Sequence, residues 1–155
     1  MGTHPSVDRI SELVLFAGLD AAEHARLASI AWLERLDAGT RLFAEGDPPG
    51  DLYVLLDGRV LLSVEVPGEP DRSLMSLRGG ELLGWTSLLG RTRVATATAV
   101  LESEVLRLPR SDLLEICETD HHVGYAIMRQ AFEEMADRLV ATRLQLLDVF
   151  GPRRS

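Results

Sequence analysis

The middle of this 155-residue chain alternates its most apolar residues with a period of two, and this pattern constrains the fold more than any other feature. One face of the segment carries Val60, Leu62, Val64 and Val66. Such a period is typical of a β-strand, because successive side chains of a strand point to opposite faces. Asp57-Gly58 precedes the segment, and a glycine there supplies the positive φ that a tight hairpin needs. The chain is therefore predicted to contain antiparallel hairpins.

Turns rich in glycine and proline recur through the same region and separate further short apolar segments. The predicted strands are Thr40–Ala44, Asp51–Leu56, Arg59–Val66, Leu74–Leu77, Gly80–Leu83, Ala95–Val100 and Glu104–Leu108. Many short strands at regular turn spacing favour a sandwich or a roll. We therefore predict a mainly β fold of the β-roll or jelly-roll type, with helices at both ends.

Both flanks of this β region have helical periodicity. Asp20 and Glu23 have the spacing of a capping box at the start of an N-terminal helix. Ser111 is predicted to cap a short helix over 112–117, and a long helix is predicted over about 122–149. These elements form a single domain over 1–155, with the roll at about 31–109 and the C-terminal helices at about 111–149.

The long helix carries an apolar seam whose members follow one another at alternating steps of four and three residues. Its members are Met128, Phe132, Met135, Leu139, Thr142, Leu146 and Val149. This heptad spacing is typical of a helix that packs along its length against a second helix. We prefer a parallel homodimer through this seam, because one small roll is too short to cover it. The alternative is packing within one chain along the whole helix.

Composition and charge exclude several classes of function. The net charge of −8 argues against a broad nucleic-acid interface, and no apolar run has the length of a membrane helix. Cys117 is the single cysteine, so no internal disulfide is expected and a cytoplasmic location is the default. Adjacent His121 and His122 are interpreted as residues of a helix start and not as metal ligands. No group of residues has the spacing of a catalytic centre, so we expect neither an enzyme nor a required cofactor.

One stretch resembles the cyclic nucleotide-binding domain family. It reads Phe43-Ala-Glu-Gly-Asp-Pro-Pro-Gly-Asp-Leu-Tyr-Val-Leu-Leu-Asp57-Gly58. The order of helix, roll and two helices over about 10–149 is also similar to the sensory half of Crp/Fnr transcription regulators. The resemblance implies a β-roll that binds cAMP or another phosphorylated small molecule and signals through its C-terminal helix.

In this family the ligand lies in a phosphate-binding cassette, which the segment 80–96 resembles. The ligand-binding residues that the resemblance implies are Gly84, Trp85, Thr86, Ser87, Arg93, Val94, Ala95 and Thr142. Arg93 matches the arginine that binds phosphate, a role suited to the bidentate fork of a guanidinium, and Arg91 is the alternative if the register shifts. Thr142 matches a position on the long helix that contacts the base, with Arg138 beside it.

Trp85 departs from the family pattern, because it stands where the family has a glutamate that accepts a hydrogen bond from ribose. An indole has a donor and no acceptor, so a cyclic nucleotide in the usual pose loses about 1–3 kcal/mol of binding free energy. Trp85 has two interpretations: it stacks on a planar ligand, or it fills the pocket as part of the core. We prefer the second, since buried aromatic side chains most often serve packing.

Three functional hypotheses follow. The leading one is a stand-alone sensor that binds a small phosphorylated or anionic ligand and acts, as a homodimer, on an unknown downstream protein without contacting nucleic acid or a membrane. The second is a ligand-free dimerising scaffold. The third is a truncated Crp/Fnr-type regulator whose DNA-binding domain is missing. The helix stop signal Gly151-Pro152 favours a chain that naturally lacks this domain.

Overall fold

The computed structural model, which describes residues 2–151, contains eight β-strands. The strands are β1 Trp32–Leu36, β2 Arg41–Phe43, β3 Leu52–Asp57, β4 Val60–Val64, β5 Arg72–Leu77, β6 Leu82–Leu83, β7 Thr96–Ala99 and β8 Ser103–Leu108. The seven predicted strands are confirmed, with ends shifted by two residues or fewer. All pairings are antiparallel, and the sheets have the orders β1-β8-β3-β6 and β2-β7-β4-β5. The predicted roll is thereby confirmed.

The first strand was not predicted, because the spacing of its apolar residues suits a helix as well as a strand. Leu33 and Leu36 lie three residues apart, directly after the helical segment. Pairing decides the outcome: the five residues of β1 lie in register with β8, from Trp32 opposite Arg107 to Leu36 opposite Ser103. A long-range partner therefore determines the conformation of this segment.

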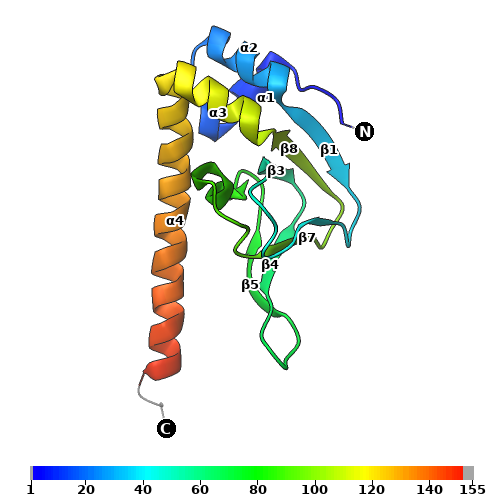
Figure 1. Ribbon diagram of the computed structural model, residues 1–155, viewed down its shortest axis with the longest axis vertical. Coiled ribbons are helices and arrows are strands. Elements are labelled where there is room, and N and C mark those ends of the chain that lie inside the picture. Colours follow the sequence, from blue (N-terminus) through cyan, green and yellow to red (C-terminus); the bar gives the residue numbers. More distant parts are fainter. Residues whose placement is uncertain (1, 152–155) are drawn as a thin grey trace.

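Helices lie at the two ends of the chain and within the cassette. Their bounds are α1 Val7–Ser11, η1 Val14–Phe16, α2 Ala21–Ile30, η2 Trp85–Leu89, α3 Arg110–Thr119 and α4 His121–Phe150, where η marks a 3₁₀ helix. Figure 1 shows α1, α2 and α3 gathered at one end of the roll, while α4 runs along its side. The helix α4 ends at Phe150, directly before Gly151, as the predicted stop signal implies. Pro152, the second residue of that signal, lies outside the described residues.

The starts of α2 and α3 bear on two predictions about helix caps. The capping box is confirmed, since the Asp20 carboxylate accepts from Glu23 N at 2.8 Å and the Glu23 carboxylate accepts from Asp20 N at 2.9 Å. The prediction that Ser111 caps α3 is wrong, because the helix already begins at Arg110, directly after Pro109. Asp51, distant in sequence, accepts from the Arg110 N–H at 3.1 Å and takes the place of a local cap.

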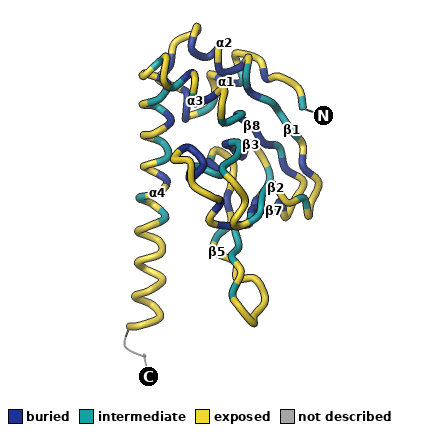
Figure 2. Tube along the Cα trace, viewed as in Figure 1, coloured by how far each residue is buried: buried dark blue, intermediate teal, exposed yellow. Residues whose placement is uncertain are grey.

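Two clusters of buried apolar residues hold the layers together. One lies between the sheets and includes Leu55, Val60 and Val105. The other joins the roll to the helices and includes Phe16 from η1 and Ile127 from α4. Figure 2 shows that burial of α4 is confined to its first half, and every residue over 139–150 is exposed. Contacts with α3, η1 and the cassette therefore hold the first half of α4, while residues 139–150 are exposed.

Gly58 makes the turn from β3 to β4 with a φ of 101°. A Cβ at this position would lie 2.6 Å from Ser103 Cβ and 2.7 Å from Ser103 Cα. Gly58→Ala is expected to lower the free energy of unfolding by about 2–5 kcal/mol, because left-handed backbone strain adds to a steric clash. Urea denaturation measures this loss.

Gly68 provides the control, since it has a φ of 77° between β4 and β5, and a Cβ at this position would have no neighbour within 4 Å. Gly68→Ala should lose only the backbone contribution of about 1–2 kcal/mol. Equal losses in the two variants would show that contact with Ser103 does not constrain the hairpin.

Candidate functional site

The cassette is a short helix bounded by two glycines. Gly84 follows β6 with a φ of 83°, η2 makes a single 3₁₀ segment, and Gly90 ends it with a φ of 71°. Both glycines are in the left-handed region, which other residues adopt only with strain. A Cβ at Gly84 would also collide with the Arg93 guanidinium and lie 3.2 Å from Asp51 O. The glycine therefore allows an arginine to lie directly against the backbone of the cassette.

Arg93 is the central charged residue of the site and is only 5% exposed. Its Nη2 donates to Asp51 O at 2.8 Å and its Nη1 donates to Gly84 O at 3.4 Å. The guanidinium carbon lies 4.1 Å from the centre of the Phe43 ring. Among residues 2–151, no carboxylate oxygen lies within 4.0 Å of a guanidinium nitrogen of Arg93, so Arg93 forms no ion pair. Burial lowers the pKa of Arg93, and the nearby Tyr53, Asp51 and Asp47 oppose this shift only in part.

A polar network fixes the cassette to the loop before β3. The Ser87 hydroxyl accepts from Gly50 N at 3.1 Å, and the Ser87 carbonyl accepts from Arg110 Nε at 2.7 Å. The Asp51 carboxylate accepts from Arg107 Nη1 at 3.1 Å, and Arg107 Nε donates to Glu34 at 2.6 Å. Arg107 thus pairs with two carboxylates, whereas Arg93 donates only to backbone carbonyl groups.

A cavity of about 50 Å³ lies against Arg93. It is lined by Phe43, Leu62, Leu83, Gly84, Trp85, Thr86, Arg93, Val94, Ala95 and Arg138. Sites for small molecules typically have about 300–1,000 Å³, and one water occupies roughly 30 Å³ of liquid. This cavity therefore has room for one or two waters, and a nucleotide requires side chains at its rim to move.

The structure brings six of the eight predicted ligand residues to this one cavity, namely Gly84, Trp85, Thr86, Arg93, Val94 and Ala95. Ser87 is buried within the polar network instead. Thr142 is exposed and does not line the cavity, whereas Arg138, one helical turn earlier, does. Their roles toward a ligand stay predictions.

Sequence reasoning missed the contribution of Phe43 and of the Asp51 carbonyl to the Arg93 environment. Both belong to the glycine-rich motif that marks the fold, and the motif was the available signal. Trp85 is half-buried and packs against the apolar cluster that joins the roll to the helices. Trp85 also lines the cavity, and both interpretations of this residue, packing and stacking on a ligand, stay predictions.

The predicted seam of α4 is largely uncovered. Phe132 is 65% exposed, Leu139 is 69% exposed and Val149 is 74% exposed. The two methionines of the seam, Met128 and Met135, are also exposed, beside an apolar groove of about 290 Å³ between η2 and α4. Packing within one chain along the whole helix, the alternative for this seam, is therefore not what this structure contains.

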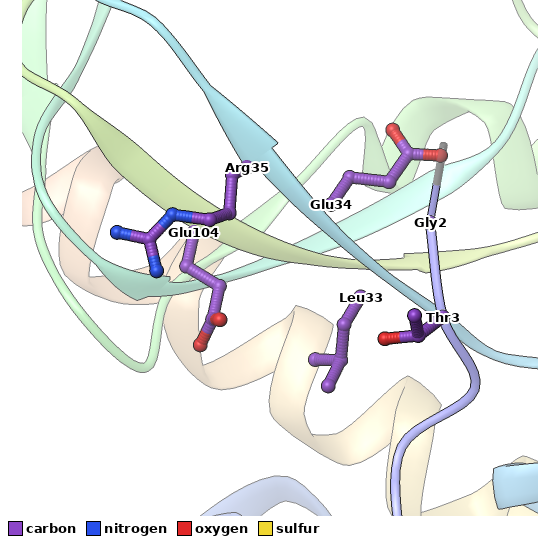
Figure 3. A pocket seen from close by; sticks show the side chains of 6 residues that line it. All are labelled: Gly2, Thr3, Leu33, Glu34, Arg35 and Glu104. Atoms are coloured by element: carbon purple, nitrogen blue, oxygen red, sulfur yellow. The ribbon is translucent and has the colours of Figure 1, made fainter.

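A larger hollow of about 530 Å³ lies at the outer edge of β1. Figure 3 shows Glu34, Arg35 and Glu104 around it, near the segment in which Thr3 bridges to Leu33. Each charged side chain there has a partner: Glu34 pairs with Arg107, Arg35 with Glu102 and Glu104 with Arg9. Because the charges at this hollow are neutralised by ion pairs, we place the candidate site at Arg93.

A metal site and a membrane-spanning helix are two further features by which a domain of this size could act. Within residues 2–151, no cluster of three or more His, Cys, Asp or Glu side chains is arranged to hold a metal ion. No helix in that range is both long enough and apolar enough to cross a bilayer. At the start of α4, Asp120 accepts from His122 N at 3.1 Å, while the His122 ring contacts the Glu23 carboxylate at 2.9 Å.

Two antiparallel sheets, a cassette with a buried arginine and a long C-terminal helix together define a class of β-roll regulatory modules. The family profile described as "Cyclic nucleotide-binding domain" matches residues 33–120, more than half of the chain. The chain belongs to the cyclic nucleotide-binding domain family.

Individual relatives agree with this assignment. The "Cyclic AMP receptor protein" of Thermus thermophilus is 33% identical over 150 residues, which cover 86% of this chain and 69% of that protein. The N-terminal domain of a transcriptional regulator from Streptomyces coelicolor A3(2) has 31% identity and a TM-score of 0.67, covering 86% of this chain and 94% of that structure. "Glutaminase 1" of Bradyrhizobium diazoefficiens is 28% identical over 138 residues, and the chain, matched over 88% of its length, spans only 22% of that protein.

Proposed function

We propose that this regulatory domain binds a small anionic ligand at Arg93 and signals through α4. The proposal rests on the guanidinium of Arg93, which is 5% exposed, lines a cavity and has no carboxylate partner among residues 2–151. A buried charge without a counter-ion is costly by several kcal/mol, and an anion in the cavity offsets that cost. Bidentate recognition by a guanidinium favours a phosphate or a carboxylate.

Backbone donors add to the proposed anion site. The N–H groups of Val94 and Ala95 make no backbone hydrogen bond within the described residues, and both residues line the cavity. Such donors next to an arginine suit the oxygens of a phosphate group. We therefore favour a phosphorylated small molecule, with cAMP as the ligand that the family suggests and Trp85 as the residue that weakens its usual pose.

The second part of the proposal is a homodimer through the seam of α4. The exposed seam residues follow heptad spacing over 128–149, and a second copy of the helix covers such a stripe by knobs-into-holes packing. Since a C2 dimer uses the same patch on both chains, the seam of α4 alone can form the whole interface. A downstream protein then responds to the position of the α4 pair.

A thermal-unfolding screen tests the anion site. Each phosphorylated compound is compared with its dephosphorylated partner, for example cAMP with adenosine, and inorganic phosphate and pyrophosphate are included. A ligand at 100 times its Kd adds about 2.7 kcal/mol of apparent stability, so a bound anion raises Tm measurably. We expect at least one phosphorylated compound to raise Tm while its neutral partner does not.

The second candidate function is a dimerising scaffold without a ligand. The observation that favours it is the small size of the cavity, about 50 Å³, which Trp85 lines. This hypothesis predicts that no compound of the screen raises Tm while the homodimer persists. That combination of results would contradict the sensor hypothesis and support the scaffold hypothesis.

A further inference from the structure

The cassette strand β6 lies at the edge of its sheet and is completed by side chains of α4. Within residues 2–151, β6 pairs with β3 alone, through Leu83 opposite Tyr53 and Leu82 opposite Val54. The backbone N–H and C=O of Leu82 face away from β3, toward the helix. Buried backbone groups at a sheet edge need partners, because an unsatisfied buried N–H or C=O costs about 1–3 kcal/mol.

Two charged residues one helical turn apart supply those partners. Both Glu134 carboxylate oxygens accept from Leu82 N at 3.0 Å, and Arg138 Nη2 donates to Leu82 O at 3.1 Å. Glu134 is 8% exposed, and Gln130 Nε2 also donates to it at 3.2 Å. Arg138 Nη2 and Glu134 Oε2 lie 3.6 Å apart, so the two side chains form a pair that binds both backbone groups of one residue.

The same arginine reaches the proposed anion site. Arg138 lines the cavity of Arg93, and the two arginines come from different parts of the molecule. Arg93 donates to Gly84 O, two residues beyond the carbonyl that Arg138 binds. The segment from Leu82 to Gly84 is therefore held by one guanidinium from the roll and one from α4.

We propose that Glu134 and Arg138 form a latch that ties α4 to the cassette, and that an anion bound at Arg93 acts on α4 through Arg138. The second half of this inference rests on the proposed function. An anion in the cavity attracts Arg138 and competes with Glu134 and Leu82 O for its donors. Ligand binding thereby changes how firmly the first half of α4 is held against the roll.

Hydrogen exchange of the Leu82 amide, followed by NMR in the full chain without ligand, tests the latch. Glu134→Ala removes the acceptor of this N–H, so its exchange is expected to accelerate by about ten- to a hundredfold. Arg138→Met keeps the apolar stem and removes the partner of Leu82 O; it should accelerate the same amide less strongly. If Glu134→Ala does not fold, the Arg138→Met result decides.

Arg129 and Glu133 supply the matched control, because they form an exposed pair at 3.2 Å on the same helix. Arg129→Met and Glu133→Ala should leave Leu82 exchange unchanged. Unaltered Leu82 exchange in both latch variants, or equal acceleration in the control variants, would overturn the latch.

A second measurement, titration with cAMP and with pyrophosphate, tests the coupling to the anion. Arg138→Met should weaken whichever probe binds the wild type by about tenfold or more. Binding that requires Arg93 but is equal in wild type and Arg138→Met would overturn the coupling and leave the proposed function standing. If neither probe binds the wild type, the proposed function and the coupling both fail, and the exchange result still decides the latch.

Discussion

Leu139→Glu is expected to convert the proposed homodimer into monomers. Leu139 is 69% exposed on the single chain and lies at the middle of the α4 seam. In a parallel pair of helices two copies of this residue face each other, so the substitution buries two unpaired carboxylates of like charge. Sedimentation equilibrium should give the mass of one chain for the variant and of two chains for the wild type at the same concentration.

Leu144→Glu provides the control on the same helix. Leu144 is 58% exposed and lies five residues after Leu139, off the seam on the side that a parallel partner leaves in solvent. This variant should remain a dimer. Monomers for the wild type would contradict the dimer, and loss of the dimer in both variants would show that the seam is not the interface.

Trp85→Glu is expected to improve the binding of cyclic nucleotides. Trp85 lines the cavity and has no hydrogen-bond acceptor for a ribose hydroxyl. A glutamate is smaller and supplies the carboxylate that the family uses at this position, so cAMP affinity should rise by about ten- to a hundredfold. Because Trp85 also packs against the core, some stability will be lost. Isothermal titration calorimetry measures the change in Kd.

Trp85→Gln separates the effect of space from that of charge, since glutamine has nearly the shape of glutamate. We expect the gain in cAMP affinity to be clearly smaller in Trp85→Gln. Equal gains would assign the whole effect to the opened cavity. No gain in Trp85→Glu would contradict the assignment of Trp85 to the ribose end of the pocket.

Local patterns predicted most of the fold because its strands and turns are encoded locally. Asp57-Gly58 indicated the hairpin between β3 and β4, and Asp20 with Glu23 indicated the start of α2. The misses have a common physical cause, since β1 and the start of α3 depend on distant partners. β1 is fixed by pairing with β8, and the first N–H of α3 is held by Asp51.

The sequence indicated most of the residues that line the cavity, but not how they are arranged in space. The cassette pattern brought Gly84 and Arg93 together correctly, because both lie in one short segment. The inward position of Arg93 depends on a tertiary contact, since its guanidinium is held by the carbonyl of Asp51, 42 residues earlier in the chain. The family resemblance implies Thr142 at the ligand with Arg138 beside it, and the packing of α4 brings Arg138, not Thr142, to the cavity.

Arg93 is proposed to be an anion-binding residue and not only a structural one. Calorimetric titration of wild type, Arg93→Met and Arg91→Met with cAMP and pyrophosphate tests this role most directly, with circular dichroism to establish that each protein is folded. Arg91 is exposed and does not line the cavity, so its variant is the control. We predict binding to wild type and Arg91→Met, and a Kd weakened by at least about tenfold in folded Arg93→Met. Equal binding by all three proteins, or no binding of either probe to the wild type, would contradict this role.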